Sequence, residues 1–438
     1  MLKRYALKEM TEVWSEANKF RLWYIIEAYA CEALLEIGLI PESVVKELWN
    51  SQPEPIDVNR IKAIEKSVQH ESIAFQMYVT EICPSIANEK YHHGLTSSDI
   101  LDTCFGLQLV SASELLTRQL KKLSTELQAK ALNYKYTPCI GRSHGIHAEP
   151  TTFGLKLARA FAEVQRNCNR LNRAQSEISV GMLSGPVGNY TNINPYVEEY
   201  VCRKLGLSVE TISSQIIPRD RYAMYFSTIG VIASSIERIS IELRQLQMTE
   251  ISEVAESFSS SQKGSSAMPH KKNPILLENV TGLSRMVKAY VSPALDNVSL
   301  WQERDMSHSS VERIIGPDAT ITLDFAIHRL TQIISNLVIN EQSMLENLNL
   351  LNGVTYSQPV LLRLIEKGLN KEKAYRMVQK SAQKTMANGL DFLTELRSDD
   401  DYAEWLSEEE LVRIFDPLVL NVRVDTIFER LLNEFDPA

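Results

Sequence analysis

The stretch GSSAMPHKKNP, at residues 264–274, holds the most informative pattern in the chain. Serine-rich sequence leads into it from Ser257, and glycine and serine favour a loop with many accessible backbone conformations. We predict that a helix begins directly after this loop, because Asn273 is a favourable N-cap residue and Pro274 suits the first helical position. The stretch therefore predicts a loop that ends at a helix N-terminus.

A junction of this kind favours the binding of anions. Free N–H groups and the positive end of the helix dipole face the loop. Lys271 and Lys272 add two positive charges close to the serine hydroxyls. We therefore expect a carboxylate or a developing oxyanion to bind here. The alternative is an ordinary capped helix that follows a polar loop and binds nothing.

The stretch resembles the signature loop of the aspartase/fumarase superfamily, GSSxMPxKxNP, at every fixed position. The resemblance implies a lyase that removes a proton next to a carboxylate and releases fumarate, without a metal or an organic cofactor. It implies that Ser265 is the catalytic base and that Lys271 and Asn273 hold the carboxylates of a succinyl group. Ser266 and Met268 of the same loop are predicted to contact the substrate.

The composition limits the class of protein. A chain of 438 residues is too long for one compact core, so two or three domains are expected. The net charge of −9 argues against general nucleic-acid binding. The six cysteines form no CxxC pair, the N-terminal sequence does not resemble a signal peptide, and no run of 18 apolar residues occurs. We therefore expect a cytoplasmic protein that neither spans a membrane nor binds nucleic acid.

Four long segments repeat apolar residues at the 3.5-residue spacing of coiled-coil packing. Since no segment has the strict alternation of a long strand, the fold class is predicted to be all-α. We expect three helical domains at residues 1–111, 112–364 and 365–438, of which the central one is an elongated bundle of long helices carrying the signature loop. The four series are Leu116, Leu120, Leu123 and Leu127; Leu157, Phe161, Val164, Cys168, Leu171, Gln175 and Ile178; Tyr225, Ile229, Ile232, Ile236, Ile239, Leu243 and Leu246; and Leu323, Ile327, Leu330, Ile334 and Leu337.

The third series is accompanied by apolar and small residues off the seam, namely Val231, Ala233, Ser234 and Ser235. A second buried face would be explained if bundles from several subunits packed together. A bundle that is buried only within one chain is the alternative.

Helices are also predicted outside the bundle. The patterns indicate helices at residues 14–37, 41–49, 58–82 and 371–387. Gly38 and Gly389 are expected to end the first and the last of these.

The second motif is GRSHGIHAEPTT, at residues 141–152. Proline brackets it, at Pro138 and within the motif at Pro150, which predicts a non-helical turn between two bundle helices. A histidine among glycines can act as a general acid near neutral pH, whereas a metal site or a structural pair of His144 with His147 are the alternatives. The motif resembles the GRTHG element of the superfamily, with serine in place of threonine at Ser143. The resemblance implies that His144 protonates the leaving nitrogen and that Glu278 orients it.

The third motif is HHGLTSSD, at residues 92–99, where Ser98 or Asp99 could simply cap a helix through residues 101–109. It is similar to the superfamily element HxGLTSxD, which contacts substrate carboxylates. That similarity implies substrate contacts for His92, Thr96 and Ser97. His93 departs from the aromatic residue that is more common at its position.

The stretch WQERDMSHSSVER, at residues 301–313, indicates which leaving group the substrate carries. Arg304, Ser309 and Arg313, which we call the phosphate fork, could bind a phosphate dianion, because guanidinium groups pair well with phosphate oxygens. A surface turn with exchangeable ion pairs is the alternative.

Further residues narrow the resemblance to the adenylosuccinate lyase family. They are the pair Arg4 and Tyr5, the pair His70 and Glu71, and Gln215, all of which are then implied to bind substrate. Two positions depart from this family: Glu71 replaces an aspartate, and Pro359 stands where arginine is common.

This resemblance implies substrates that are succinylated purine-pathway nucleotides, namely adenylosuccinate and succinylaminoimidazole carboxamide ribotide. It also implies a homotetramer with a multi-helix core, whose active sites combine residues from three subunits. The rivals are another fumarate-releasing lyase, such as argininosuccinate lyase, and a coiled-coil scaffold without chemistry.

Overall fold

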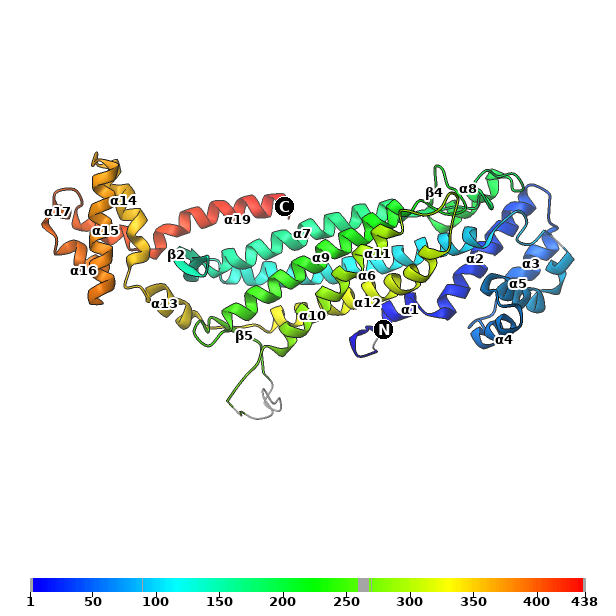
Figure 1. Cartoon of the computed structure of the whole chain (residues 1–438), viewed down its shortest axis with the longest axis horizontal. Helices are drawn as coiled ribbons and strands as arrows, with labels where there is room; N and C mark the ends of the chain where they lie inside the picture. The colour runs from blue at the N-terminus through cyan, green and yellow to red at the C-terminus, as the bar shows by residue number, and fades with distance from the viewer. Residues whose placement is uncertain (1–2, 89, 259–267, 269, 436–438) are drawn as a thin grey trace. The chain divides into compact units, whose positions relative to one another are not determined.

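The computed structural model describes residues 3–88, 90–258, 268 and 270–435 (Figure 1). Helices make up most of these residues, and the strands occur only in short two-stranded pairs, so the prediction of an all-α chain is confirmed. Within the described part of the chain, none of the helices combines the length and the apolar character that crossing a membrane requires.

The chain divides into two compact units. Unit 1 consists of Met1–Lys121, Asn167–Glu237 and Gly282–His328, and unit 2 of Lys122–Arg166, Arg238–Thr281 and Arg329–Ala438. Five helices contribute residues to both units. They are α6 (Ser97–Asn133), α7 (Phe153–Ile178), α9 (Arg219–Leu246), α10 (Ile275–Ala289) and α12 (Ser307–Ser335).

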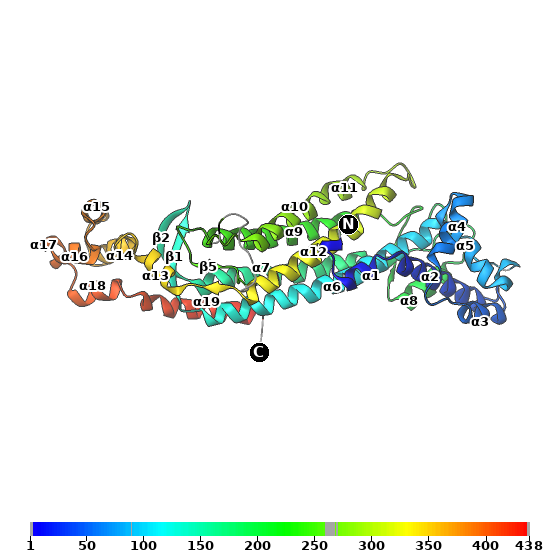
Figure 2. The same cartoon turned by 90° about the horizontal axis from the view of Figure 1, so that it is seen from below.

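Unit 1 adds shorter helices and one two-stranded pair. Its core contains Trp23 and Phe75, whose rings meet edge to face with centroids 5.5 Å apart. Helix α8 packs against α2 (Figures 1 and 2). The elements are η1 (Lys3–Tyr5), α1 (Lys8–Val13), α2 (Glu16–Glu36), α3 (Glu42–Asn50), α4 (Val58–Val68), α5 (Glu71–Ile82), η2 (Pro84–Asn88), β3 (Val180–Gly181), α8 (Pro195–Leu205), β4 (Ser208–Val209) and α11 (Val291–Asp296).

The expected helix at 14–37 is present as α2, which begins after Ser15, and the Ser15 side chain caps it by accepting the N–H of Asn18 at 3.1 Å. One other predicted helix of unit 1 is broken in two. The expected helix at 58–82 ends at Gln69, which adopts a left-handed φ of 53°. His70 then caps α5, and its Nδ1 accepts the N–H of Ile73 at 3.3 Å. The break places His70 at a helix N-terminus, which the apolar pattern alone did not reveal.

The predicted seam is the buried face of the long helices. Every apolar residue of the four series is buried, and only Gln175 is partly exposed. Polar bonds add to this packing in each unit. In unit 1, Ser113 of α6 bonds Tyr225 of α9 at 3.0 Å, and in unit 2, Gln165 of α7 bonds Ser124 of α6 at 3.0 Å. The 3.5-residue spacing therefore identified the packed face correctly.

The four off-seam residues of α9 do not behave alike. Ala233 and Ser235 are buried within the single chain, whereas Val231 and Ser234 are exposed. Burial of Ala233 and Ser235 therefore needs no second subunit, and a second face buried between subunits stays a prediction for Val231 and Ser234.

Unit 2 contains a β-hairpin, a second two-stranded pair and a group of short helices. Phe392, Leu396 and Tyr402 lie in the core of that group, and the hydroxyl of Tyr402 bonds Ser381 at 3.1 Å. Gly389 ends α15 in the left-handed conformation, as predicted. The elements are β1 (Pro138–Ser143), β2 (Ile146–Thr152), β5 (Val254–Ala255), β6 (Val338–Ile339), α13 (Glu341–Asn349), η3 (Val354–Tyr356), α14 (Ser357–Glu366), α15 (Lys371–Asn388), α16 (Phe392–Arg397), α17 (Asp400–Ala403), α18 (Glu408–Ile414), η4 (Pro417–Leu420) and α19 (Asn421–Phe435).

Candidate functional site

His144 lies at the tip of the hairpin β1–β2 in unit 2. Ser143 pairs with Ile146, so the turn consists of His144 and Gly145 alone. Both have positive φ, 54° and 81°, as a tight two-residue hairpin turn requires. The predicted non-helical turn is confirmed, but its flanks are strands, which the sequence pattern missed. The turn leaves the His144 side chain exposed.

A largely buried ion pair holds the hairpin next to its turn. Arg142 Nη2 lies 2.7 Å from Glu253 Oε1, and Glu253 is fully buried. Asn347 of α13 donates to the same oxygen at 2.9 Å, and α13 packs against β1 (Figure 2). His147 pairs with Arg142 across the hairpin, and burial together with that positive charge lowers the pKa of His147. His147 is therefore held neutral under the turn and is not part of its exposed tip.

The signature loop is described only at its C-terminal end. Ser265 and Ser266, the predicted base and its neighbour, lie outside the described residues. Met268, Lys271 and Lys272 are exposed, and Asn273 is partly buried.

Predicted residues on both sides of the α10 N-terminus line one groove of about 960 Å³ in unit 2. The structure thus brings Met268, Lys271, Asn273 and Glu278 together. Glu278 is exposed there, and within one chain the described residues include no hydrogen bond between Glu278 and His144. Arg244 and Met248 of the lining were not anticipated from the sequence.

The N-terminus of α10 differs from the prediction in one important respect. The helix begins at Ile275, and its N–H groups are not all free. Glu256 accepts the N–H of Leu276 at 3.2 Å and that of Leu277 at 2.7 Å. Burial raises the pKa of Glu256, and these two hydrogen bonds oppose that rise. A carboxylate of the chain itself therefore occupies part of the predicted anion site, and Lys271 and Asn273 remain available for a ligand.

The phosphate fork lines a pocket of about 210 Å³ in unit 1. Arg304, Ser309 and Arg313 all contribute to it, as the spacing suggested. Lys19 also lines it and was not predicted, because it is distant in the chain from the other three residues. A guanidinium pair, a hydroxyl and an ammonium around one small pocket suit a phosphate dianion.

Glu71 links two cations of this pocket. Its carboxylate pairs with Lys19 and, at 2.8 Å, with Arg313 Nη2. Burial alone would raise the pKa of Glu71, but Lys19 and Arg313 hold it below its usual value. The departure from aspartate therefore has a structural role, since the longer side chain reaches both cations.

A buried network lies beneath the fork. Arg219 bonds Asp102 and Glu312, with Nε 3.0 Å from Glu312 Oε1 and Nη2 3.0 Å from Asp102 Oδ1. His308 lies against Glu312 with Nδ1 3.0 Å from Oε2, and Arg304 Nε lies 3.3 Å from its Nε2. The sequence analysis assigned no role to these four residues: His308 and Glu312 lie in the same motif as the fork, but Asp102 and Arg219 come from other helices that only the fold brings there.

The HHGLTSSD segment is held by two buried carboxylates. His92 has a φ of 54°, and its Nδ1 lies 2.5 Å from Glu27. Although burial would lower it, the carboxylate of Glu27 raises the pKa of His92. Asp99 accepts the N–H groups of Thr96 at 2.7 Å and Ser184 at 3.0 Å, and burial raises its pKa to about 7. Asp99 is thus the third residue of α6, and its carboxylate ties the start of this helix to the backbone of Thr96 and Ser184.

The other residues of unit 1 that were predicted to bind substrate are not among the residues that line the phosphate-fork pocket. Arg4 is exposed, and the Tyr5 ring packs on Phe325 with centroids 5.5 Å apart. Gln215 is partly buried in a loop that Ser214 ties to the carbonyl of Glu303 at 2.7 Å. The others that fall outside this lining are His70, His92, Thr96 and Ser97.

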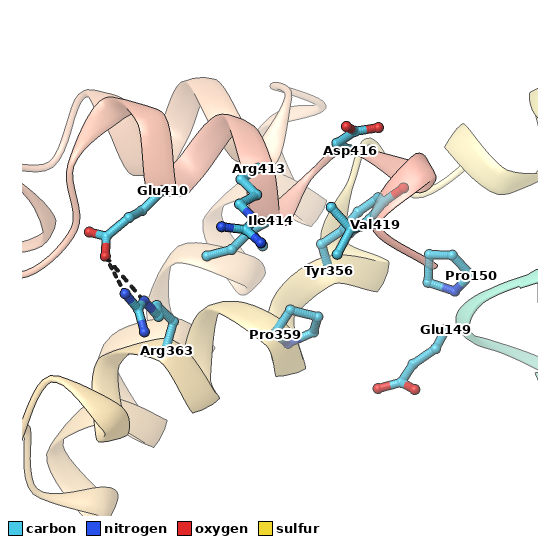
Figure 3. A pocket seen from close by; sticks show the side chains of 10 residues that line it. All are labelled: Glu149, Pro150, Tyr356, Pro359, Arg363, Glu410, Arg413, Ile414, Asp416 and Val419. Atoms are coloured by element: carbon cyan, nitrogen blue, oxygen red, sulfur yellow. Dashed lines mark hydrogen bonds and ion pairs between the residues drawn. The ribbon is translucent and has the colours of Figure 1, made fainter. Parts of the chain in front are cut away.

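Pro359 lies in a different pocket of unit 2, of about 460 Å³, which residues of strand β2 help to line (Figure 3). Glu149 and Tyr356 also line it, and Arg363 pairs there with Glu410. As the third residue of α14, Pro359 needs no helical N–H partner, so it is accommodated without loss of a hydrogen bond. No residue predicted from the sequence as part of the site lines this pocket.

Comparison with known proteins agrees with this geometry. Residues 4–288 match the family described as "Lyase", and residues 353–431 match "Adenylosuccinate lyase C-terminus". The chain is 47% identical over 436 residues to adenylosuccinate lyase of Thermotoga maritima, covering 99% of this chain and 100% of that protein.

Solved structures show the same fold. Fumarate lyase from Mesorhizobium sp. BNC1 superposes with a TM-score of 0.88 at 22% identity, over 98% of this chain and 99% of that one. The 3-carboxy-cis,cis-muconate lactonizing enzyme from Pseudomonas putida gives 0.87 at 25% identity, over 98% of both chains. The chain belongs to the adenylosuccinate lyase family of the aspartase/fumarase superfamily and is a carbon–nitrogen lyase.

Proposed function

We propose that this chain eliminates fumarate from adenylosuccinate, giving AMP, and from succinylaminoimidazole carboxamide ribotide, giving the carboxamide ribotide, in purine nucleotide biosynthesis. The observation that carries the proposal is the full-length identity of 47% to an adenylosuccinate lyase. The phosphate fork supports it independently, because fumarase, aspartase and argininosuccinate lyase act on substrates without a phosphate group.

Phosphate recognition is assigned to the pocket of unit 1. Arg304 and Arg313 supply planar donor pairs, Ser309 supplies a hydroxyl, and Lys19 adds a third positive charge. Glu71 offsets part of that charge in the free protein. A phosphate that displaces the Glu71 carboxylate from Arg313 would form a stronger pair, since it carries two negative charges.

Elimination is assigned to groups of the signature loop and the hairpin. In this mechanism Ser265 removes the proton from the carbon next to a carboxylate. Lys271 and Asn273 stabilise the negative charge that develops on that carboxylate, and His144 protonates the departing nitrogen. A serine hydroxyl is a weak base in water, so the reaction needs a site from which water is excluded. The mechanism uses no metal or organic cofactor.

We propose that the protein works as a homotetramer with shared sites. Exposed apolar side chains on the long helices support this, because a water-soluble monomer has few of them on one helix face. In unit 1 they include Met224 and Val231 of α9, Met286 of α10 and Ile314 of α12, each at least 45% exposed. His144 and Glu278 are both exposed in a single chain. Their exposure is compatible with a site in which the Glu278 of one subunit orients the His144 of another.

A cytoplasmic location is also proposed. All six cysteines are buried free thiols, as in a protein of a reducing compartment.

The function is tested by mixing the purified protein with adenylosuccinate. We expect the absorbance of the succinylated purine to fall while fumarate and AMP appear in equal amounts. Argininosuccinate serves as the comparison substrate and should not be cleaved. Cleavage of argininosuccinate with no turnover of adenylosuccinate would overturn the proposal in favour of the rival lyase.

A further inference from the structure

His308 is the feature of unit 1 that the mechanism above does not use. Its side chain is 2% exposed and lies between the phosphate fork and the buried network. On one side, its Nδ1 is 3.0 Å from Glu312 Oε2. On the other side, its Nε2 is 3.3 Å from Nε of Arg304. The histidine thus connects a buried carboxylate to a residue of the fork.

The chemistry of the neighbours fixes which ring nitrogen carries the proton. Glu312 only accepts hydrogen bonds when ionised, so Nδ1 must donate to it. Arg304 only donates, so Nε2 must accept from it. Arg219 Nη2 also lies 3.0 Å from Nδ1, but it can direct its two hydrogens to Asp102 Oδ1 and Glu312 Oε2, at 3.0 and 3.1 Å. A neutral imidazole with the proton on Nδ1 then donates to Glu312 and accepts from Arg304.

Buried ion pairs hold Glu312 in place for this purpose. Arg219 bonds Glu312 through Nε at 3.0 Å and through Nη2 at 3.1 Å. It also bonds Asp102, and Arg219, Asp102 and Glu312 are all at most 8% exposed. Side chains in such a network have little freedom to rotate, so the position of His308 is determined by three helices: α6, α9 and α12.

We propose that His308 is a positioning residue that orients the guanidinium of Arg304 for phosphate, through the chain Arg219–Glu312–His308–Arg304. This inference rests on the proposed function, because it takes Arg304 to be a phosphate ligand. Nε of Arg304 is occupied by His308, so the two terminal Nη groups remain free to face a dianion as a fork.

The experiment measures binding of sulfate, as a stand-in for a phosphate dianion, to the full-length protein by calorimetry at pH 8. For His308→Leu, which cannot accept from Arg304, we expect affinity to fall about tenfold, equivalent to about 1.4 kcal/mol. In His308→Gln, whose amide oxygen can also accept from Arg304, affinity should stay within about threefold of the wild type.

A further variant separates the possible failures. Arg304→Gln should weaken sulfate binding at least as much as His308→Leu does. If Arg304→Gln has no effect, the phosphate assignment within the proposed function is wrong and the inference falls with it. If Arg304→Gln weakens sulfate binding but His308→Leu does not, or if His308→Gln weakens it as much as His308→Leu, only the role of His308 is refuted.

Discussion

The carboxylate of Glu256 lies 2.7 Å from the backbone nitrogen of Leu277 and thereby caps the helix that follows the signature loop. Glu256 is separated from that helix by the whole loop, so one hydrogen-bonded contact joins the two ends of the loop. The same carboxylate limits where a substrate anion can bind, because it already occupies two N–H groups of α10. Substrate charge is therefore met mainly by side chains.

Replacement of this cap should reduce both stability and activity. We expect Glu256→Ala to lower the free energy of unfolding by about 1–2 kcal/mol, as loss of a helix cap does. Turnover should fall more than substrate affinity, because loss of the cap loosens the helix N-terminus that positions Lys271 and Asn273. Urea unfolding and steady-state kinetics measure the two effects. Glu250→Ala, at an exposed glutamate nearby, is the matched control and should change neither quantity.

The ion pair beneath His144 should be costly to break. Glu253→Ala leaves Arg142 buried without its partner, and loss of one member of a buried pair costs about 3–5 kcal/mol. The exposed pair Arg118–Glu9 provides the comparison, and Glu9→Ala should cost less than about 1 kcal/mol. Equal losses of stability in the two variants would contradict the importance assigned to the ion pair next to the turn.

Asp99 should make stability fall with rising pH. Burial raises the pKa of Asp99 to about 7, above the value near 4 that an unfolded chain has. The folded state therefore holds the proton more tightly, so this contribution is present at low pH and is lost as the pH rises from about 4 through 7. Asp99→Asn cannot ionise, so the melting temperature of the wild type relative to this variant should decline between pH 5 and 8. A constant difference would show that Asp99 ionises normally.

Sharing of sites between subunits can be tested with two inactive variants. Ser265→Ala and His144→Asn should each reduce turnover by several orders of magnitude. If different chains supply these residues, unfolding and refolding the two variants together should restore part of the activity, since some sites then receive both intact groups. Recovery should be absent if each chain builds its own site, which would remove the case for shared sites.

The sequence predicted the features that depend on local pattern. The heptad spacing identified the buried face of the long helices, and Gly389 marked a helix end, because both depend on residues close together in the chain. The break at Gln69 in the predicted helix at 58–82 was missed, since no glycine or proline marks that position in the sequence. Strands β1 and β2 were missed because they are short and interrupted by a bulge. The predicted boundaries at residues 111 and 364 remain predictions.

The candidate site was predictable only where a motif is contiguous. The spacing of Arg304, Ser309 and Arg313 placed them correctly on one pocket. Lys19 and Arg219 come from other segments, and no pattern within one segment reveals a partner that the fold supplies. The same reason explains why Glu256 was not foreseen as the cap of α10.

The left-handed backbone of His144 restricts how this enzyme can be redesigned. Asparagine tolerates that conformation far better than alanine or a β-branched residue, and glycine follows it in the turn. A substrate-trapping variant for crystallography is therefore best made as His144→Asn, which removes the acid and preserves the shape of the hairpin. An alanine variant would mix a chemical defect with a folding defect, and its kinetics would report neither cleanly.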